Sequence, residues 1–392
     1  MKIMIWGCGR FGKQAYYYYN QYADIAGFVD SDKNKWGTWF FDKEVYPPKA
    51  LEGFKGKVVI AVKNNYGDIQ KTLENTYGIY DIVLFKVEEQ PLKTLEYSDE
   101  CAKIDENTIM IYFMGGLGNQ MFQYALAKNY LRQGKHVIAN IETYLTSGNR
   151  EFVLCDVFNN IALNFGGDIQ KNKIIEKNSK IDAGYKNFRI HVEDIRENRD
   201  KTVNMVLQNI TSGILCGYYQ NYYFAQQVEN ELRKDFTFNA NNDEKLIEVK
   251  KRIQELNCVS VHIRRGDYVT KEVQPIYGGI CTQQYYDRAV KIMKDKLGSC
   301  TFCFFSNDMR WVKECFKIPD AIYIESDMFE DYQDWYDMYL MSRCKHNIIA
   351  NSSFSWWGAW LNQNENKIVI APKRWINLYE QTDICPTDWI LI

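Results

Sequence analysis

The last third of the chain alternates short apolar segments with longer amphipathic ones, and this alternation constrains the fold more than any other feature. Strands are predicted at residues 258–264, 301–306, 321–325, 347–350 and 367–371. Helical patterns lie between them, near residues 282–296, 309–316, 332–343 and 354–363. Strands that alternate with helices build a parallel sheet covered by helices, so this part is predicted to be a doubly wound α/β half.

The first of these strands runs into a polar stretch, His262-Ile-Arg-Arg-Gly-Asp-Tyr268. Alternate side chains of a strand share a face, so His262 and Arg264 lie on one side and Ile263 on the other. Open parallel sheets bind ligands at the carboxyl ends of their strands, and Arg offers phosphate two parallel donors. The stretch predicts an anion site. The alternative is a solvated Arg–Asp turn.

A glycine-rich turn opens the chain. Residues 3–6 read as a strand, Gly7-Cys-Gly-Arg-Phe-Gly12 as the turn, 13–23 as a helix, and 25–29 as a strand ending at Asp30. This order matches the dinucleotide fingerprint, in which glycines admit a pyrophosphate to a helix N-terminus. With further strands at 57–62 and 82–85, it predicts a small Rossmann-like domain over residues 1–100.

Two interpretations of that domain stay open. Gly7, Gly9, Gly12 and Asp30 are its candidate nucleotide-binding residues. The alternative is a Rossmann-like module that binds no dinucleotide, and no Tyr-x-x-x-Lys pair is present for hydride chemistry. Asp30-Ser-Asp32 also forms a D-x-D, which holds a metal and nucleotide diphosphate in some glycosyltransferases. A ribose or turn role is simpler here, because the motif follows a fingerprint strand.

A second strand–glycine–helix unit follows a polar stretch at 88–107, where we place a domain boundary. Its predicted elements are a strand at 108–113, a turn at Gly115–Gln120, a helix at 121–131 and a strand at 136–141. Asn119 at the helix start can cap the helix or bind a hydroxyl. Residues 145–215 show no clear order of helices and strands. The Tyr- and amide-rich segment 216–224 suits either a sugar groove or a packed turn.

Composition excludes several classes. The 48 basic and 50 acidic residues nearly cancel, which argues against nucleic-acid binding and adhesion to acidic membranes. No apolar run approaches the ~20 residues of a membrane span. Eleven cysteines in a long chain favour reduced thiols and a cytoplasmic location. Cys300 and Cys303 lie three apart on a strand, so they face opposite ways and predict buried thiols instead of a metal or redox pair.

Three long motifs together resemble one family, and a weaker match adds Phe305-Ser-Asn-Asp308 with Trp311. They are Gly115-Gly-Leu-Gly-Asn-Gln-Met-Phe-Gln-Tyr-Ala125, His262-Ile-Arg-Arg-Gly-Asp-Tyr268 and Asn351-Ser-Ser-Phe-Ser-Trp-Trp-Gly-Ala-Trp-Leu361. They stand in the order found in glycosyltransferase family 11, the α-1,2-fucosyltransferases. The resemblance covers about residues 108–392 and leaves the first 100 outside.

The resemblance implies a GT-B-like pair of Rossmann-like halves, here 108–250 on the acceptor side and 251–392 on the donor side, after the small Rossmann-like domain. It implies inverting transfer of L-fucose from GDP-β-L-fucose to the 2-hydroxyl of a terminal β-galactoside in an oligosaccharide or surface glycan. No metal or other cofactor is expected.

The family motifs also suggest roles for single residues. Arg264 would stabilise the leaving phosphate, Asp267 would be the general base, and Asn119 would face the acceptor or the fucose. The expected donor-binding residues are His262, Arg265, Asp308, Ser353, Phe354 and Ser355. The alternative for Asp267 is that it locks the loop by pairing with an arginine, and the alternative for Asp308 is a helix N-cap. Glu142 and Asp156 are the other candidates for the base.

Two other functions stay open at this point: an NAD-dependent oxidoreductase led by the first glycine turn, and a non-catalytic nucleotide-sugar-binding protein. From the sequence we expect a bacterial, cytoplasmic enzyme, and peripheral attachment at the inner membrane is compatible with it. A homo-oligomer is also compatible with the sequence.

Overall fold

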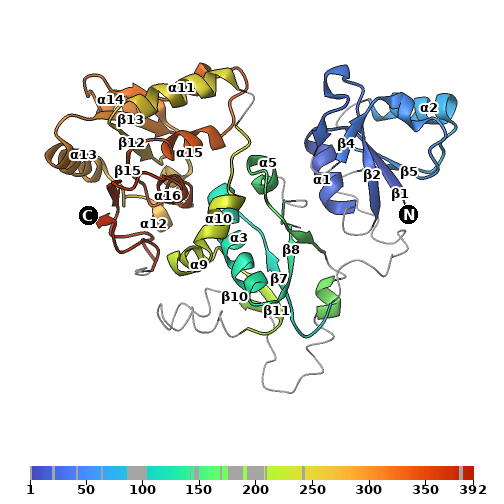
Figure 1. Cartoon of the computed structure of the whole chain (residues 1–392), viewed down its shortest axis with the longest axis horizontal. Helices are drawn as coiled ribbons and strands as arrows, with labels where there is room; N and C mark the ends of the chain where they lie inside the picture. Colours follow the sequence, from blue (N-terminus) through green and yellow to red (C-terminus); the bar gives the residue numbers. More distant parts are fainter. Residues whose placement is uncertain are drawn as a thin grey trace.

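The computed structural model describes residues 2–19, 23–40, 43–62, 65–85, 104–141, 143–144, 150–167, 170–174, 189–191, 207, 210–240, 243–378 and 383–392. These residues form a mixed α/β fold with three largely parallel sheets (Figure 1). The expected linker at 88–107 lies mostly outside the described residues, and Glu142 lies outside them too.

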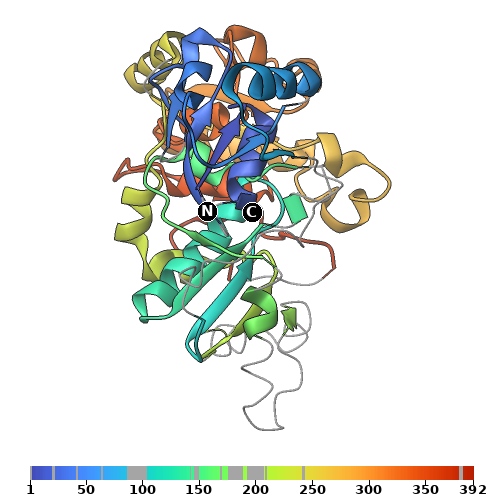
Figure 2. The same ribbon diagram turned by 90° about the vertical axis from the view of Figure 1, so that its right-hand side faces the viewer.

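The first sheet has the strand order β3-β4-β2-β1-β5-β6. Its strands are β1 (Lys2–Trp6), β2 (Asp24–Val29), β3 (Trp39–Phe40), β4 (Lys43–Tyr46), β5 (Lys57–Ile60) and β6 (Ile82–Leu84). Only β3 and β4 pair antiparallel. The helices are α1 (Arg10–Tyr19) and α2 (Tyr66–Tyr77), and the sheet lies in front in Figure 2. The sequence did not indicate β3 and β4, a short hairpin at the sheet edge.

The second sheet has the order β10-β11-β7-β8-β9, all parallel. Its strands are β7 (Thr108–Tyr112), β8 (His136–Asn140), β9 (Asn164–Phe165), β10 (Arg189–His191) and β11 (Gly213–Cys216). Its helices are α3 (Leu117–Arg132), α5 (Leu154–Val157), α9 (Tyr222–Gln227) and α10 (Glu229–Asp235). The expected start of α3 at 121 was wrong, because Gly116 takes the N-cap position and the helix begins at Leu117.

The third sheet has the order β14-β13-β12-β15-β16-β17, all parallel. Its strands are β12 (Cys258–Ile263), β13 (Thr301–Ser306), β14 (Ile322–Tyr323), β15 (His346–Ile348), β16 (Val369–Ala371) and β17 (Ile390–Leu391). Its helices are α11 (Glu244–Glu255), α12 (Gln274–Tyr277), α13 (Gln283–Leu297), α14 (Met309–Cys315), α15 (Trp335–Met341) and α16 (Ser353–Trp360). The expected division between residues 250 and 251 falls inside α11, which packs against α15.

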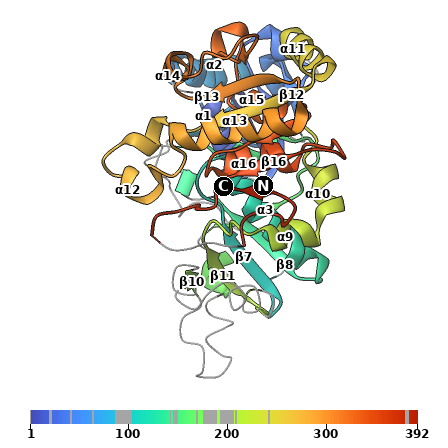
Figure 3. The ribbon, with the colours of Figure 1, turned by 90° about the vertical axis from the view of Figure 1, so that its left-hand side faces the viewer.

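Helices α3 and α16 join the second and third sheets. They lie against each other between the two sheets (Figure 3). Trp356 and Trp357 are fully buried, and their ring centroids lie 4.7 and 4.9 Å from that of Phe122 in α3. Aromatic pairs of this kind add about 0.5–1.5 kcal/mol each to the gain from burial. The tryptophans of the third motif are therefore core residues that fix the two halves together.

A buried carboxyl in α15 makes stability depend on pH. Burial, with repulsion from Asp334, raises the pKa of Asp337 to about 7, despite a hydrogen bond with Tyr332. The folded chain then binds more protons here than the unfolded chain between about pH 4 and 7, so stability falls as pH rises through that window.

Asp337→Asn should therefore stabilise the chain at pH 8 by on the order of 3–4 kcal/mol, from a shift of about three pKa units. At pH 3.5 it should change stability little. Urea midpoints at the two pH values measure this, with the exposed Asp331→Asn as control. Equal gains at both pH values would contradict the assignment.

Candidate functional site

His262 is the penultimate residue of β12, and its side chain is almost fully buried, 4% exposed. Burial, and secondarily the Arg264 charge, lowers the pKa of His262 to about 3, so the ring is neutral at physiological pH. The ring lies 5.8 Å from that of Phe354, centroid to centroid. Among the described residues its Nδ1 has no hydrogen-bond partner. A buried polar atom without a partner is costly, so this nitrogen suits a ligand atom.

Arg264 follows His262 and makes an ion pair within its own loop. Its Nη2 lies 2.8 and 2.9 Å from the two carboxylate oxygens of Asp267. Arg150, from the second unit, approaches the same carboxylate at 3.5 Å. The guanidinium of Arg264 also lies 5.7 Å from the ring centre of Tyr268. Asp267 thus holds two guanidiniums where the two halves meet, as the alternative of a loop-locking Asp anticipated.

Arg265 points to the next strand of the sheet. Its Nε donates to Asp308 Oδ2 at 3.0 Å, and its guanidinium stacks on Trp311 at 4.2 Å. Asp308 is also the N-cap of α14 and accepts from Trp311 N at 3.2 Å. The cap is the alternative role that the sequence predicted for Asp308, but the sequence did not identify Asp308 as the partner of Arg265. The contacts leave the expected role of Asp308 in donor binding an open prediction.

The glycine turn before α3 brings the second half to the same place. Gly115 has φ +80°, a left-handed backbone that favours glycine. A Cβ on Gly118 would lie 2.5 Å from Phe354 N and from Ser353 C, so the two backbones are in contact. The indole of Trp357 donates to Gly118 O at 3.0 Å. Only glycine permits this approach of α3 to the start of α16.

Asn119 neither caps α3 nor is free. Its Oδ1 accepts from Ser353 Oγ at 2.8 Å and from Gln220 Nε2 at 2.7 Å. Gln220 in turn accepts from the indole of Trp375 at 2.9 Å. Of the two roles that the sequence allowed, the amide binds a hydroxyl, that of Ser353, and so links the first turn of α3 to the first turn of α16.

The first turn of α16 carries the remaining donor-side candidates. Ser352 is its N-cap without a side-chain bond, so the first backbone N–H groups of the helix are not capped by that hydroxyl. Ser353 bonds to Asn119, and Phe354 lies beside His262. Ser355 is fully buried, and its hydroxyl donates to the carbonyls of Ala350 and Ser352 at 3.3 and 3.2 Å. An uncapped helix start facing His262 suits a phosphate.

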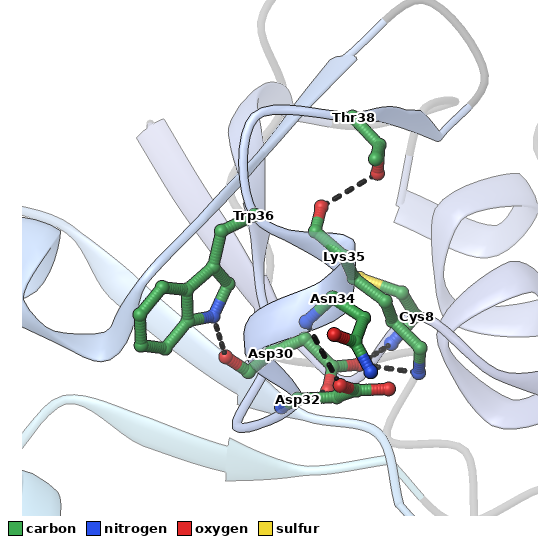
Figure 4. A network of polar contacts seen from close by, with 7 residues as sticks. All are labelled: Cys8, Asp30, Asp32, Asn34, Lys35, Trp36 and Thr38. Carbon is green, nitrogen blue, oxygen red and sulfur yellow. Dashed lines mark hydrogen bonds and ion pairs between the residues drawn. The ribbon is translucent and has the colours of Figure 1, made fainter.

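In the first unit, Asp30 and Asp32 lie in a network of polar contacts that also includes Cys8 and Lys35 (Figure 4). Asp30 Oδ2 accepts from Cys8 N at 2.9 Å and Lys35 Nζ at 3.0 Å, and Oδ1 accepts from Asp32 N at 2.9 Å. Burial alone would raise the pKa of Asp30, but these hydrogen bonds lower it. Asp32 accepts from Asn34 N at 3.0 Å. Both carboxylates of the D-x-D thus stabilise the local turn through hydrogen bonds.

The glycines of that turn serve the packing of the chain. A Cβ on Gly12 would lie 1.8 Å from Gly7 O, and one on Gly7 would lie 2.5 Å from Ala61 O. A Cβ on Gly9 would meet nothing within 4 Å. The contacts explain Gly7 and Gly12 without a ligand, and the nucleotide prediction for this unit stays a prediction.

One segment connects the first unit with the candidate site. Lys13 of α1 pairs with Asp156 of α5, and burial lowers the pKa of Lys13 to about 8. Gln120 of α3 donates to Glu151 O at 2.9 Å and accepts from Val153 N at 3.0 Å. Residues 150–157 therefore touch α1, α3 and, through Arg150, Asp267. No local sequence pattern marks Arg150, because its position beside Asp267 depends on tertiary contact.

Among the described residues, no helix is both apolar and long enough to cross a bilayer.

Comparisons with known proteins agree with the motifs. Residues 90–392 match Glycosyl transferase family 11, and residues 1–82 match the family "C2185-like, N-terminal". The chain is similar to "Alpha-1,2-colitosyltransferase" of Escherichia coli, at 35% identity over 71% of this chain and 96% of that protein. It is also similar to "O-antigen biosynthesis glycosyltransferase WbnK" of Escherichia coli, at 30% identity over 70% of this chain and 97% of that protein.

A more distant relative is "Galactoside alpha-(1,2)-fucosyltransferase 1" of Saimiri boliviensis boliviensis. It is 24% identical over 154 residues, which are 38% of this chain and 42% of that protein. The family match covers most of the chain, and the two bacterial relatives align along nearly their whole length. This chain therefore belongs to glycosyl transferase family 11.

Proposed function

We propose that the chain is an inverting α-1,2-fucosyltransferase that moves L-fucose from GDP-β-L-fucose to the 2-hydroxyl of a terminal β-galactoside in an oligosaccharide or surface glycan. The main support for this proposal is the position of His262. Its ring is buried and neutral, it lies beside Arg264, and it faces the uncapped first turn of α16. Two relatives whose names specify an α-1,2 linkage support the same regiochemistry.

In this proposal the second and third units are a GT-B-like pair of Rossmann-like halves, and the donor lies where α3 meets α16. As the C1–O bond to the β-phosphate breaks, negative charge grows on the leaving GDP. A fixed guanidinium and helix N–H groups favour that charge in the transition state. Arg264 supplies the guanidinium, and His262 orients the diphosphate with Nδ1.

Asp267 is the candidate general base for the acceptor hydroxyl, but its carboxylate already holds Arg264 and lies 3.5 Å from Arg150. Asp267 can accept a proton only after Arg264 has moved away from its carboxylate. We propose that bound GDP-fucose causes this movement, because its phosphate competes with Asp267 for the N–H groups of the Arg264 guanidinium.

A second donor follows from the similarity to a colitosyltransferase. Colitose is fucose without the 3-hydroxyl. A site that hydrogen-bonds a substrate hydroxyl rejects the analogue lacking it by about 10⁴–10⁵, whereas an apolar site discriminates far less. GDP-fucose should therefore exceed GDP-colitose in kcat/KM, and the reverse order would assign the chain to colitose.

The deciding assay is GDP release from GDP-fucose with and without lactose, in EDTA. We expect release that depends on the acceptor, a fucosylated product, and unchanged rate in EDTA, since cationic side chains replace a metal here. Loss of activity that Mg²⁺ or Mn²⁺ restores would contradict metal independence. GDP binding without release on any β-galactoside would favour the non-catalytic nucleotide-sugar-binding protein.

The oxidoreductase alternative is weakened by Asp30, whose two carboxylate oxygens are engaged within their own turn. A ribose would have to displace those bonds. Cys8, Cys216, Cys258, Cys303 and Cys344 are buried free thiols, which supports a reducing cytoplasmic compartment in this proposal.

A further inference from the structure

Three cysteines far apart in the sequence come together in the core of the third unit. Cys258, Cys303 and Cys344 place their Sγ atoms within 4.8 Å of one another, and Cys258 and Cys344 are 3.6 Å apart. Cys258 and Cys303 are fully buried, and Cys344 is 2% exposed. Among the described residues, no His nitrogen or carboxylate joins this set.

The sheet register explains the meeting. Cys303 on β13 pairs with Ser260 on β12, and Cys258 lies two residues before Ser260 on the same face. Lys345 N donates to Cys258 O at 2.9 Å, which holds the adjacent Cys344 beside the start of β12. Cys300 faces the opposite core, as the sequence predicted, so the C-x-x-C is not the pair that matters.

The distances suit metal–thiolate bonds. With sulfur about 2.3 Å from an ion, as for zinc, two ligands lie about 3.8–4.0 Å apart in tetrahedral or trigonal geometry. The three sulfurs are within less than an ångström of that arrangement. Thiolates prefer soft ions, and structural zinc almost always takes four protein ligands.

We infer that Cys258, Cys303 and Cys344 form a buried three-thiolate site for a soft, thiophilic ion that accepts three sulfur ligands, as Cu(I) does.

The site is structural and separate from the donor site. Cys258 and Arg264 are at opposite ends of β12, about 20 Å apart at ~3.3 Å per residue. An ion there ties β12 and β13 to the segment before β15. The inference does not depend on the proposed transfer activity.

The test uses the full chain, purified without oxygen, incubated with Cu(I)–glutathione and desalted. We expect a single copper per chain by elemental analysis, an ultraviolet thiolate-to-copper band, and a higher urea midpoint. Cys303→Ala should lose all three effects. Cys300→Ala removes a thiol from the same strand region but not from the cluster, and should keep them.

Equal copper in the wild-type chain and Cys303→Ala would overturn the site, as would an equal loss in Cys300→Ala. Should Cys303→Ala fail to fold, Cys344→Ala and thiol counting on the wild-type chain serve instead. Copper should then protect three thiols from alkylation. A folded chain that retains no copper, or one whose Cys258 and Cys344 form a disulfide in mild oxidant with copper present, would refute the inference.

Discussion

Arg264→Ala should lower kcat by about 10²–10³ or more, because it removes the guanidinium that we propose stabilises the leaving phosphate. Arg264→Lys should not restore activity, since an ammonium lacks the planar fork that engages two oxygens. Steady-state kinetics with GDP-fucose and lactose measure the loss, and GDP binding by calorimetry separates affinity from turnover. Arg310 is the matched control: it pairs with Glu314 in the same unit but is exposed. Arg310→Ala should leave kcat unchanged.

Full turnover in folded Arg264→Ala would remove Arg264 from the mechanism. The companion variant Asp267→Asn distinguishes two roles of that carboxylate, general base and ion-pair partner of Arg264. If Asp267 is the base, its loss abolishes transfer and the acidic limb of the pH–rate profile together. If it only holds Arg264, transfer declines while the limb persists.

Gly118→Ala should have the second large effect. Its Cβ would lie 2.5 Å from backbone atoms of Ser353 and Phe354, closer than real contacts allow, so α3 and α16 must separate. Overpacking of this kind costs about 1–3 kcal/mol. The separation also displaces Asn119 from Ser353 and turns the start of α16 away from His262. We expect kcat/KM to fall at least tenfold, together with the urea midpoint.

Gly67→Ala is the control for this substitution. Gly67 is the second residue of α2, as Gly118 is of α3, and a Cβ there would meet nothing within 4 Å. It should raise stability slightly, by about 0.4–1 kcal/mol, through the unfolded chain. Normal kinetics in Gly118→Ala would show that the two halves can shift without harm.

The sequence predicted the elements that carry strong local signals. Residues 301–306 form a strand over the predicted range, and 258–264 differs only at its last residue. Both are apolar runs buried on two faces, which is typical of central parallel strands. Helix α11 was missed although Asp243 caps it and Leu246, Val249 and Ile253 are spaced for burial. The N-cap and the helical spacing of the apolar residues therefore indicate this helix in the sequence.

The rest of the site could not be predicted because it depends on tertiary contact. The two-residue strands β3 and β17 are too short for a period. Nothing local places Arg150 near Asp267, or brings Cys344 to Cys258. The roles of Asn119 and Gly118 follow from the approach of α3 to α16, which a single motif cannot show.

The segment 150–157 connects the first unit with the proposed donor site. Lys13 pairs with Asp156 at one end, and Arg150 approaches Asp267 at the other. Under the proposed function, a partner that binds the first unit and shifts this segment would change the free energy of donor binding. Linkage is reciprocal, so donor binding then changes the affinity for that partner by the same factor. In the proposed enzyme, the first unit would then both sense and influence the binding of the donor.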